Sequence, residues 1–247
     1  MNSIPQPWDY LIITASSAAQ AEAYEHQLAL RAGAGLLKNF RTSMVVADPG
    51  GQRIGSGGST LYCLLQVLER ELSDDGRDGI DWAAIEQILT RRRILILHAG
   101  GDSRRLPAYG PCGKIFVPVP GGATAGVPAA GVPAAVFDHL LAVFTPFPAP
   151  AAGLGQVVVA AGDALLRFDA RQIRLAPEGM TALGSPATPD EAKKHGVFCM
   201  ATDGLVSPAR LVLQKPSLAR QGQRGAIGSD GLSILDVGVM SLSLIHI

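Results

Sequence analysis

A run of four apolar residues, Ile94-Leu-Ile-Leu97, separates the charged pair Arg92-Arg93 from the glycine pair Gly100-Gly101. A short, uninterrupted apolar run of this kind is typical of a parallel β-strand that is buried on both faces. Such a strand needs helices on each side of its sheet. The run therefore predicts an α/β domain with a mixed, mainly parallel sheet flanked by helices.

The rest of the chain alternates between strand and helix patterns as such a domain requires. Apolar runs predict strands over residues 9–14, 42–47 and 156–161, and apolar residues at helical spacing predict helices over 18–30, 55–68, 82–90 and 136–144. The later segments are short and β-rich, and they predict strands over 179–185, 195–201, 210–215 and 233–240. We expect these mixed strands to shape a substrate pocket. We expect residues 233–240 to form an exposed apolar edge.

The charge balance limits the partners of this 247-residue chain. It has 21 basic and 21 acidic residues, so there is no electrostatic case for binding nucleic acid or an anionic membrane surface. No apolar stretch reaches the length of a membrane span and the N-terminus has no signal-like pattern, so we expect a cytoplasmic location. Three cysteines without metal-ligand spacing predict reduced structural thiols.

The loop that begins at His98, directly after the strand predicted over residues 92–97, carries the chemistry. In open α/β sheets, ligands bind at the carboxyl ends of the strands, and Gly100 and Gly101 allow backbone N–H groups to approach a phosphate. Arg104 and Lys114 add fixed positive charge, which can hold a triphosphate and stabilise a departing pyrophosphate. The alternative interpretation is a tight turn with two solvated cations.

Two well-known phosphate loops are excluded by spacing. A Walker A motif needs a glycine and a Ser or Thr where Ala108 and Ile115 stand. A dinucleotide-binding loop needs a third glycine where Arg105-Leu106-Pro107 stands. The loop is therefore one that carries charge rather than one built of glycine alone.

Two further segments belong to the same predicted edge of the sheet. Gly55-Ser-Gly-Gly-Ser-Thr60 begins a helix, whose free N–H groups can bind an anion or a base; a glycine-rich turn that packs the helix closely is equally compatible. Asp163 follows the 156–161 strand, where a carboxylate can hold Mg²⁺ against phosphate oxygens; a helix or turn cap is the alternative.

These motifs together resemble the pyrophosphorylase part of the L-fucokinase/GDP-fucose pyrophosphorylase family, which is similar to the nucleotide-sugar pyrophosphorylases. The resemblance runs from about residue 9 to about residue 240, and the ordered set of motifs is more specific than any one of them. The matching segments are 9–16, 21–28, 51–61, 96–107, 113–114, 158–163, 195–198, 214–217 and 236–238.

The resemblance implies a Rossmann-like nucleotidyltransferase fold and a set of site residues. The signature Gly-x-x-x-Arg-x-x-Pro, followed by a lysine, falls on Gly100, Arg104, Pro107 and Lys114. The implied roles are catalysis for Arg104 and Lys114; nucleotide or phosphate binding for Gly55, Gly57, Gly58, Ser59, Gly100, Gly101, Asp102 and Ser103; sugar-phosphate binding for His195, Gly196, Lys215 and Asp236; and Mg²⁺ binding for Asp163.

The implied reaction transfers GMP from GTP to L-fucose 1-phosphate, giving GDP-L-fucose and pyrophosphate. No covalent nucleophile is needed, because the attacking phosphate is already ionised. Another nucleotide and sugar pair, or a nucleotide-sugar-binding domain without catalysis, are the alternatives. A sugar kinase is disfavoured, because no catalytic base lies within a recognisable phosphate loop.

The end of the chain calls for a separate interpretation. Leu242-Ser-Leu-Ile-His-Ile247 is the in-frame translation of a transposon end used in sequencing libraries, so we expect the natural domain over residues 1–241 to be truncated. A second metal ligand is then expected beyond Met240. In full-length members of the resembling family, a C-terminal kinase domain makes fucose 1-phosphate, and no segment of this chain matches it.

Overall fold

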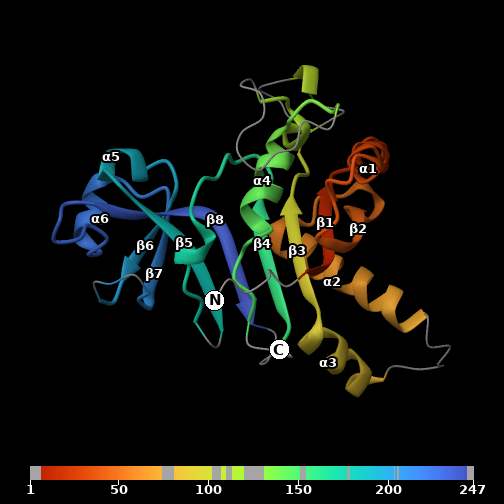
Figure 1. The fold of residues 1–247 in the computed structure, drawn as a ribbon. Helices are drawn as coiled ribbons and strands as arrows, with labels where there is room; N and C mark the ends of the chain where they lie inside the picture. Colours follow the sequence, from red (N-terminus) through yellow and green to blue (C-terminus); the bar gives the residue numbers. More distant parts are fainter. Residues whose placement is uncertain are drawn as a thin grey trace.

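The computed structural model describes residues 7–73, 81–101, 107–109, 113–119, 131–150, 154–176, 179–202, 204 and 206–243 (Figure 1). The first half contains β1 (Trp8–Ala15), α1 (Ala18–Gly33), β2 (Phe40–Ala47), α2 (Gly55–Ser73), α3 (Trp82–Arg91), β3 (Arg93–His98), α4 (Val136–Phe144) and β4 (Gln156–Ala161). The second half contains β5 (Met180–Ala187), α5 (Pro189–Ala192), β6 (Gly196–Met200), β7 (Ala209–Gln214), α6 (Leu218–Gln223) and β8 (Ser233–Ser243). The 3-10 turns are η1 (Pro49–Gly51), η2 (Pro107–Tyr109), η3 (Lys114–Phe116) and η4 (Ala170–Gln172).

The eight strands of the described residues form one mixed sheet. Strands β2, β1, β3 and β4 are neighbours in that order and all run parallel. The remaining strands are antiparallel to their neighbours and lie at the other end of the sheet with α5 and α6 (Figure 1). The predicted α/β class, with one mixed sheet flanked by helices, is confirmed. The prediction that the sheet is mainly parallel is wrong, because three of the strand pairs are parallel and four are antiparallel among the described residues.

Strand β8 lies inside the sheet and joins its two halves. Strand β5 pairs with it from Ser233 to Leu242, and so occupies one edge. On the other edge, β4 pairs with residues 239–243 and β6 pairs with Ile234 and Leu235. The prediction of an exposed apolar edge at residues 233–240 is therefore wrong, because a long strand in this position is paired on both sides.

A bulge in β8 marks the place where its partner changes. Residues 237–239 of β8 face the single residue Leu183 of β5. Gly238 has a φ of 74°, a conformation that glycine adopts readily and other residues rarely do. A Cβ on Gly238 would lie 3.3 Å from Cβ of Ala161, so the bulge brings β8 close to the carboxyl end of β4.

Strands β1 and β3 are buried on both faces, as the apolar run predicted. Leu11, Ile13, Leu95 and Leu97 pack in the core that contains α1 and α4, whereas Ile12, Ile94 and Ile96 pack in the core that contains Cys63 and Val67 of α2. The second half has a much smaller core, formed by Ala192, Val197, Cys199, Leu213 and Ala226. The large double core holds the carboxyl ends of the parallel strands in fixed positions.

Among the described residues, no helix combines the length and apolar character that crossing a membrane requires. Leu242 and Ser243 form the end of β8, and residues 244–247 lie outside the described part of the chain. The assignment of residues 242–247 to a sequencing adapter stays a prediction.

Candidate functional site at the carboxyl edge of the sheet

The parallel strands end together at one edge of the sheet, and the predicted glycine segments meet there. Helix α2 begins at Gly55, as predicted, and its first turn contains Gly57 and Gly58. The Ser59 hydroxyl donates a hydrogen bond to Oδ1 of Asp48, just beyond β2, at 2.7 Å. The start of α2 is thereby fixed at this edge, where its free N–H groups are available to an anion.

His98, the last residue of β3, joins three elements at this edge. Its Nε2 lies 2.9 Å from Oγ1 of Thr60 on α2, and its Nδ1 lies 3.5 Å from Oγ1 of Thr14 on β1. Burial lowers the pKa of His98, although the carboxylate of Asp48 acts in the opposite direction. The residue pattern indicated His98 only as the start of the loop, and no motif predicted this bridge.

The charged loop begins directly after His98. A Cβ on Gly100 would lie 3.3 Å from the Ser16 backbone nitrogen, so glycine lets the loop pass close to the end of β1. Gly101 has a φ of 147°, and among the described residues nothing lies within 4 Å of the position that a Cβ would take on it. Asp102, Ser103 and Arg104 lie outside the described residues, and their roles stay predictions.

Lys114 and Asp163 come together at the carboxyl end of β4. Nζ of Lys114 lies 2.9 Å from Oδ2 of Asp163, and the two side chains are 47% and 53% exposed. Gly162 positions the aspartate: its N–H donates to the His98 carbonyl, and a Cβ there would lie 2.9 Å from that oxygen. The Asp163 carboxylate is therefore paired with a lysine, in contrast to the capping role weighed above.

The four residues predicted to surround a sugar phosphate also come together, where β6, β7 and β8 meet. The Lys215 N–H donates to the His195 carbonyl at 2.9 Å. A Cβ on Gly196 would lie 3.1 Å from Cβ of Asp236. Asp236 in turn accepts a hydrogen bond from the N–H of Gly238, the bulge residue beside Ala161. This cluster therefore adjoins the end of β4, two residues before Asp163.

Lys215 has a strained backbone within this cluster. Its φ of 46° is uncommon for a residue with a Cβ, and such conformations concentrate at functional sites. Gln221, which the sequence analysis missed, holds the next residue in place: its buried side-chain amide donates to the carbonyls of Pro216 and Pro189. Ser233 completes the arrangement by donating to Oε1 of Gln221 at 2.7 Å.

The donor set for a cation is small. Among the described residues, no group of three or more carboxylate, imidazole or thiol side chains is placed to hold a metal ion. Asp163 offers one half-exposed carboxylate. Mg²⁺ commonly uses only one or two protein carboxylates together with phosphate oxygens of a substrate, so this residue fits such a role.

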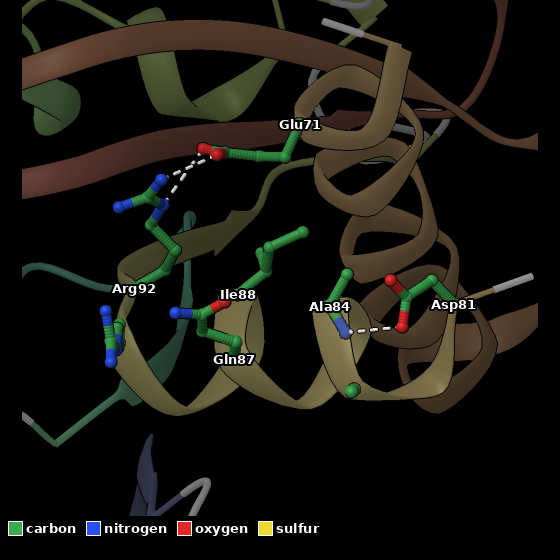
Figure 2. Close-up of a pocket in the computed structure, with 8 residues that line it drawn as sticks. Glu71, Asp81, Ala84, Gln87, Ile88 and Arg92 are labelled. Carbon is green, nitrogen blue, oxygen red and sulfur yellow. Dashed lines mark hydrogen bonds and ion pairs between the residues drawn. The ribbon is translucent and has the colours of Figure 1, made fainter. Parts of the chain in front are cut away.

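A hollow of about 470 Å³ lies elsewhere, between the end of α2 and helix α3 (Figure 2). Its walls include Glu71 and Arg92, joined by a two-bond ion pair, and Asp81, which caps α3 through the N–H of Ala84. Helix α3 leads into the amino end of β3, so the hollow lies at the edge opposite to the glycine segments. It is not part of the candidate site.

Comparison with known protein families gives a match over most of the chain. The sequence model of the fucose pyrophosphorylase domain matches residues 86–244, which include Gly100, Lys114, Asp163, Lys215 and Asp236. The chain belongs to the fucose pyrophosphorylase family. No solved structure matches the chain.

Curated relatives in plants, bacteria and animals match most of the chain. It is 34% identical over 249 residues to the bifunctional fucokinase/GDP-fucose pyrophosphorylase of Arabidopsis thaliana, a match that covers 95% of this chain and 23% of the relative. It is 32% identical to the L-fucokinase/L-fucose-1-P guanylyltransferase of Bacteroides fragilis (80% and 19% covered) and 31% identical to the human fucose-1-phosphate guanylyltransferase (91% and 35%). The chain thus spans about a fifth to a third of these relatives.

Proposed function

We propose that the chain is a Rossmann-like nucleotidyltransferase domain that transfers GMP from GTP to L-fucose 1-phosphate. The observation that carries this proposal is the adjacency of two clusters suited to anions. Lys114 and Asp163 lie at the end of β4, and the bulge at Gly238 connects that end to the cluster of Lys215 and Asp236. A reaction between two polyanions needs such neighbouring sites, because like charges must be brought together in line.

The proposed step is a direct displacement at phosphorus. An ionised phosphate oxygen of fucose 1-phosphate bonds to the α-phosphorus of GTP, and the bond from that phosphorus to the oxygen bridging to the β-phosphate breaks. Pyrophosphate carries away the released electron pair, so no proton has to leave the nucleophile. Lys114, together with Arg104 as predicted from the sequence, would stabilise the charge that develops on the leaving group.

Asp163 is the residue proposed to hold Mg²⁺, which supplies charge neutralisation at the phosphates when bound. In the described structure the Asp163 carboxylate is paired with Lys114, and this exposed pair is weak enough to open for a ligand. Gly100, Gly101 and the first turn of α2 are proposed to bind the nucleotide through backbone N–H groups. His195 and Lys215 are proposed to contact the sugar phosphate.

The names of the relatives support the choice of substrates, since two of them combine a fucokinase with the pyrophosphorylase or guanylyltransferase. We propose that a kinase domain supplies fucose 1-phosphate to this domain in the same way. Because GTP is an intracellular nucleotide and Cys63 and Cys199 are buried free thiols, we propose a cytoplasmic location.

The test is pyrophosphate release, measured with each nucleoside triphosphate against several sugar 1-phosphates in the presence of Mg²⁺. Release that requires both GTP and fucose 1-phosphate supports the proposal. Asp163→Asn should lower the rate about 100-fold or more, whereas Asp190→Asn, in an exposed lysine pair on α5, should leave it unchanged. Saturable GTP binding without release would favour a binding domain without catalysis, and release with another pair would change the substrates.

A further inference from the structure

Tyr24 of α1 contacts both ends of the charged loop, at Ala99 and at Gly113. Its side chain is fully buried in the core that contains α1 and α4. Its hydroxyl donates a hydrogen bond to the carbonyl of Ala99 at 2.9 Å, directly before Gly100. A helix that is distant in sequence thus fixes the point at which the loop leaves β3.

The other end of the loop rests on the same ring. Gly113 has a φ of 63°, and a Cβ on it would lie 2.6 Å from Cζ and 2.8 Å from Cε1 of Tyr24. Only glycine leaves room for the tyrosine there, since real Cβ atoms do not approach carbon so closely. The ring of Phe116, in η3, also packs against Tyr24, with centroids 5.3 Å apart and planes at 63°. Lys114 lies between these two contacts.

We propose that Tyr24 is a positioning residue, which holds Ala99 and Gly113 at fixed separation so that the loop delivers Lys114 to the reacting phosphates. The inference rests on the proposed function for the reaction itself, but not for the coupling between the two ends. A triphosphate and its cation need side chains held to within a fraction of an ångström, and loop residues reach that precision only when a rigid element supports them.

The first test compares two buried aromatic residues of the same core. Tyr24→Phe removes the hydroxyl that reaches Ala99, and Trp8→Phe removes an indole N–H that donates to the Phe144 carbonyl at 3.1 Å, far along the chain from the loop. Amide hydrogen exchange reports local opening independently of catalysis. We expect exchange at Gly100, Gly101 and residues 114–116 to rise about tenfold in Tyr24→Phe, and to stay at the wild-type rate in Trp8→Phe.

Kinetic measurements give a second test, because a purely structural role for Tyr24 would not change kcat separately from the KM for GTP. With GTP and fucose 1-phosphate, Tyr24→Phe should lower kcat about tenfold and change the KM for GTP by less than about twofold, because the loop acts on the transition state. Trp8→Phe should lower Tm with unchanged kcat. Equal exchange in the two variants, or a rise at only one end of the loop, would overturn the inference. A wild-type chain that releases no pyrophosphate would refute the proposed function and leave the exchange result standing.

A second pair of variants separates two effects of replacing glycine. One is the steric clash of a new Cβ with Tyr24, and the other is the energetic cost of a positive φ in a residue that has a Cβ. Gly113→Ala meets Tyr24, whereas Gly231→Ala has the same kind of positive φ (78°) with nothing within 4 Å of its Cβ. We expect Gly113→Ala to lower kcat at least tenfold and Gly231→Ala to leave it unchanged. In the double variant Gly113→Ala with Tyr24→Phe, the losses should not add, since both changes disturb one contact. Full additivity would contradict the coupling.

Discussion

Two ion pairs, each between a basic side chain and an aspartate, lie in opposite environments. Arg31 of α1 and Asp138 of α4 form a two-bond pair, with distances of 2.7 and 2.8 Å, and their side chains are 1% and 5% exposed. Lys114 and Asp163 form a single 2.9 Å contact at the edge of the sheet, and both side chains are about half exposed. The first pair holds elements together, and the second is open to a ligand.

The surroundings explain the difference. The guanidinium of Arg31 lies over the rings of Phe116 and Phe137, at 5.0 and 5.5 Å from their centroids, and Asp138 also accepts the N–H of Ala135 at the start of α4. A desolvated pair of this kind is costly to break, because either partner alone would be a buried charge. Water and salt screen an exposed lysine–carboxylate pair, so such a pair adds little to stability.

Arg31→Met should produce the largest effect of the predicted substitutions, and this effect is on stability. The substitution leaves the Asp138 carboxylate buried without its partner, and we expect the free energy of unfolding to fall by about 3–5 kcal/mol. Urea denaturation measures this directly. The double variant Arg31→Met with Asp138→Leu should recover part of the loss, because no buried charge remains. A loss below about 1 kcal/mol for Arg31→Met would place the buried pair in the same class as the exposed one.

Lys114→Ala should show the reverse pattern. Pyrophosphate release should fall about 100-fold or more, equivalent to about 2.7 kcal/mol of transition-state stabilisation, while the unfolding free energy changes by less than about 1 kcal/mol. Lys193→Ala is the matched control, because Lys193 forms a similarly exposed pair with Asp190 at 2.6 Å. Near-normal release by Lys114→Ala, or an equal loss in Lys193→Ala, would refute the role of Lys114.

Sequence patterns predicted the first half of the fold closely, because its signals are local. The helix over 136–144 begins and ends where predicted, and the strand over 9–14 is one residue longer at each end, at Trp8 and Ala15. The place of β8 was not predictable in this way. Its residues specify a strand, but which strands it joins depends on the positions of β4, β5 and β6, which are far apart in the chain.

The candidate site shows the same division. The motifs identified Lys114 and Asp163 because charged residues at strand ends are conspicuous in sequence, and the structure brings these two together. Tyr24 and Arg31 were missed, since an aromatic residue and a cation on an amphipathic helix have no feature that distinguishes them from ordinary helix residues. The signal for Tyr24 was indirect: Gly113, directly before the lysine, needs a glycine because a ring fills the adjacent space.

His98 is partly buried, so its exposure to water is between that of the buried Arg31–Asp138 pair and that of the exposed Lys114–Asp163 pair. Its effect on stability should be the smallest. Burial lowers its pKa from the ordinary value of 6.5, so the unfolded chain binds a proton more readily than the folded one. Stability therefore falls as the pH drops from about 6.5 to the lower folded pKa, and levels off below it. The slope for one such group is at most about 1.4 kcal/mol per pH unit.

His98→Gln isolates this contribution, because glutamine keeps a polar group near Thr60 and does not titrate. We expect its unfolding free energy to depend less on pH than that of the wild type below about pH 6.5, measured by urea denaturation at several pH values. The same measurement on His26→Gln, on the exposed side of α1, controls for the loss of an imidazole from the chain. Identical pH dependence in wild type and His98→Gln would mean that solvent reaches the imidazole as freely as it reaches Lys114, and that His98 belongs with the open edge rather than with the core.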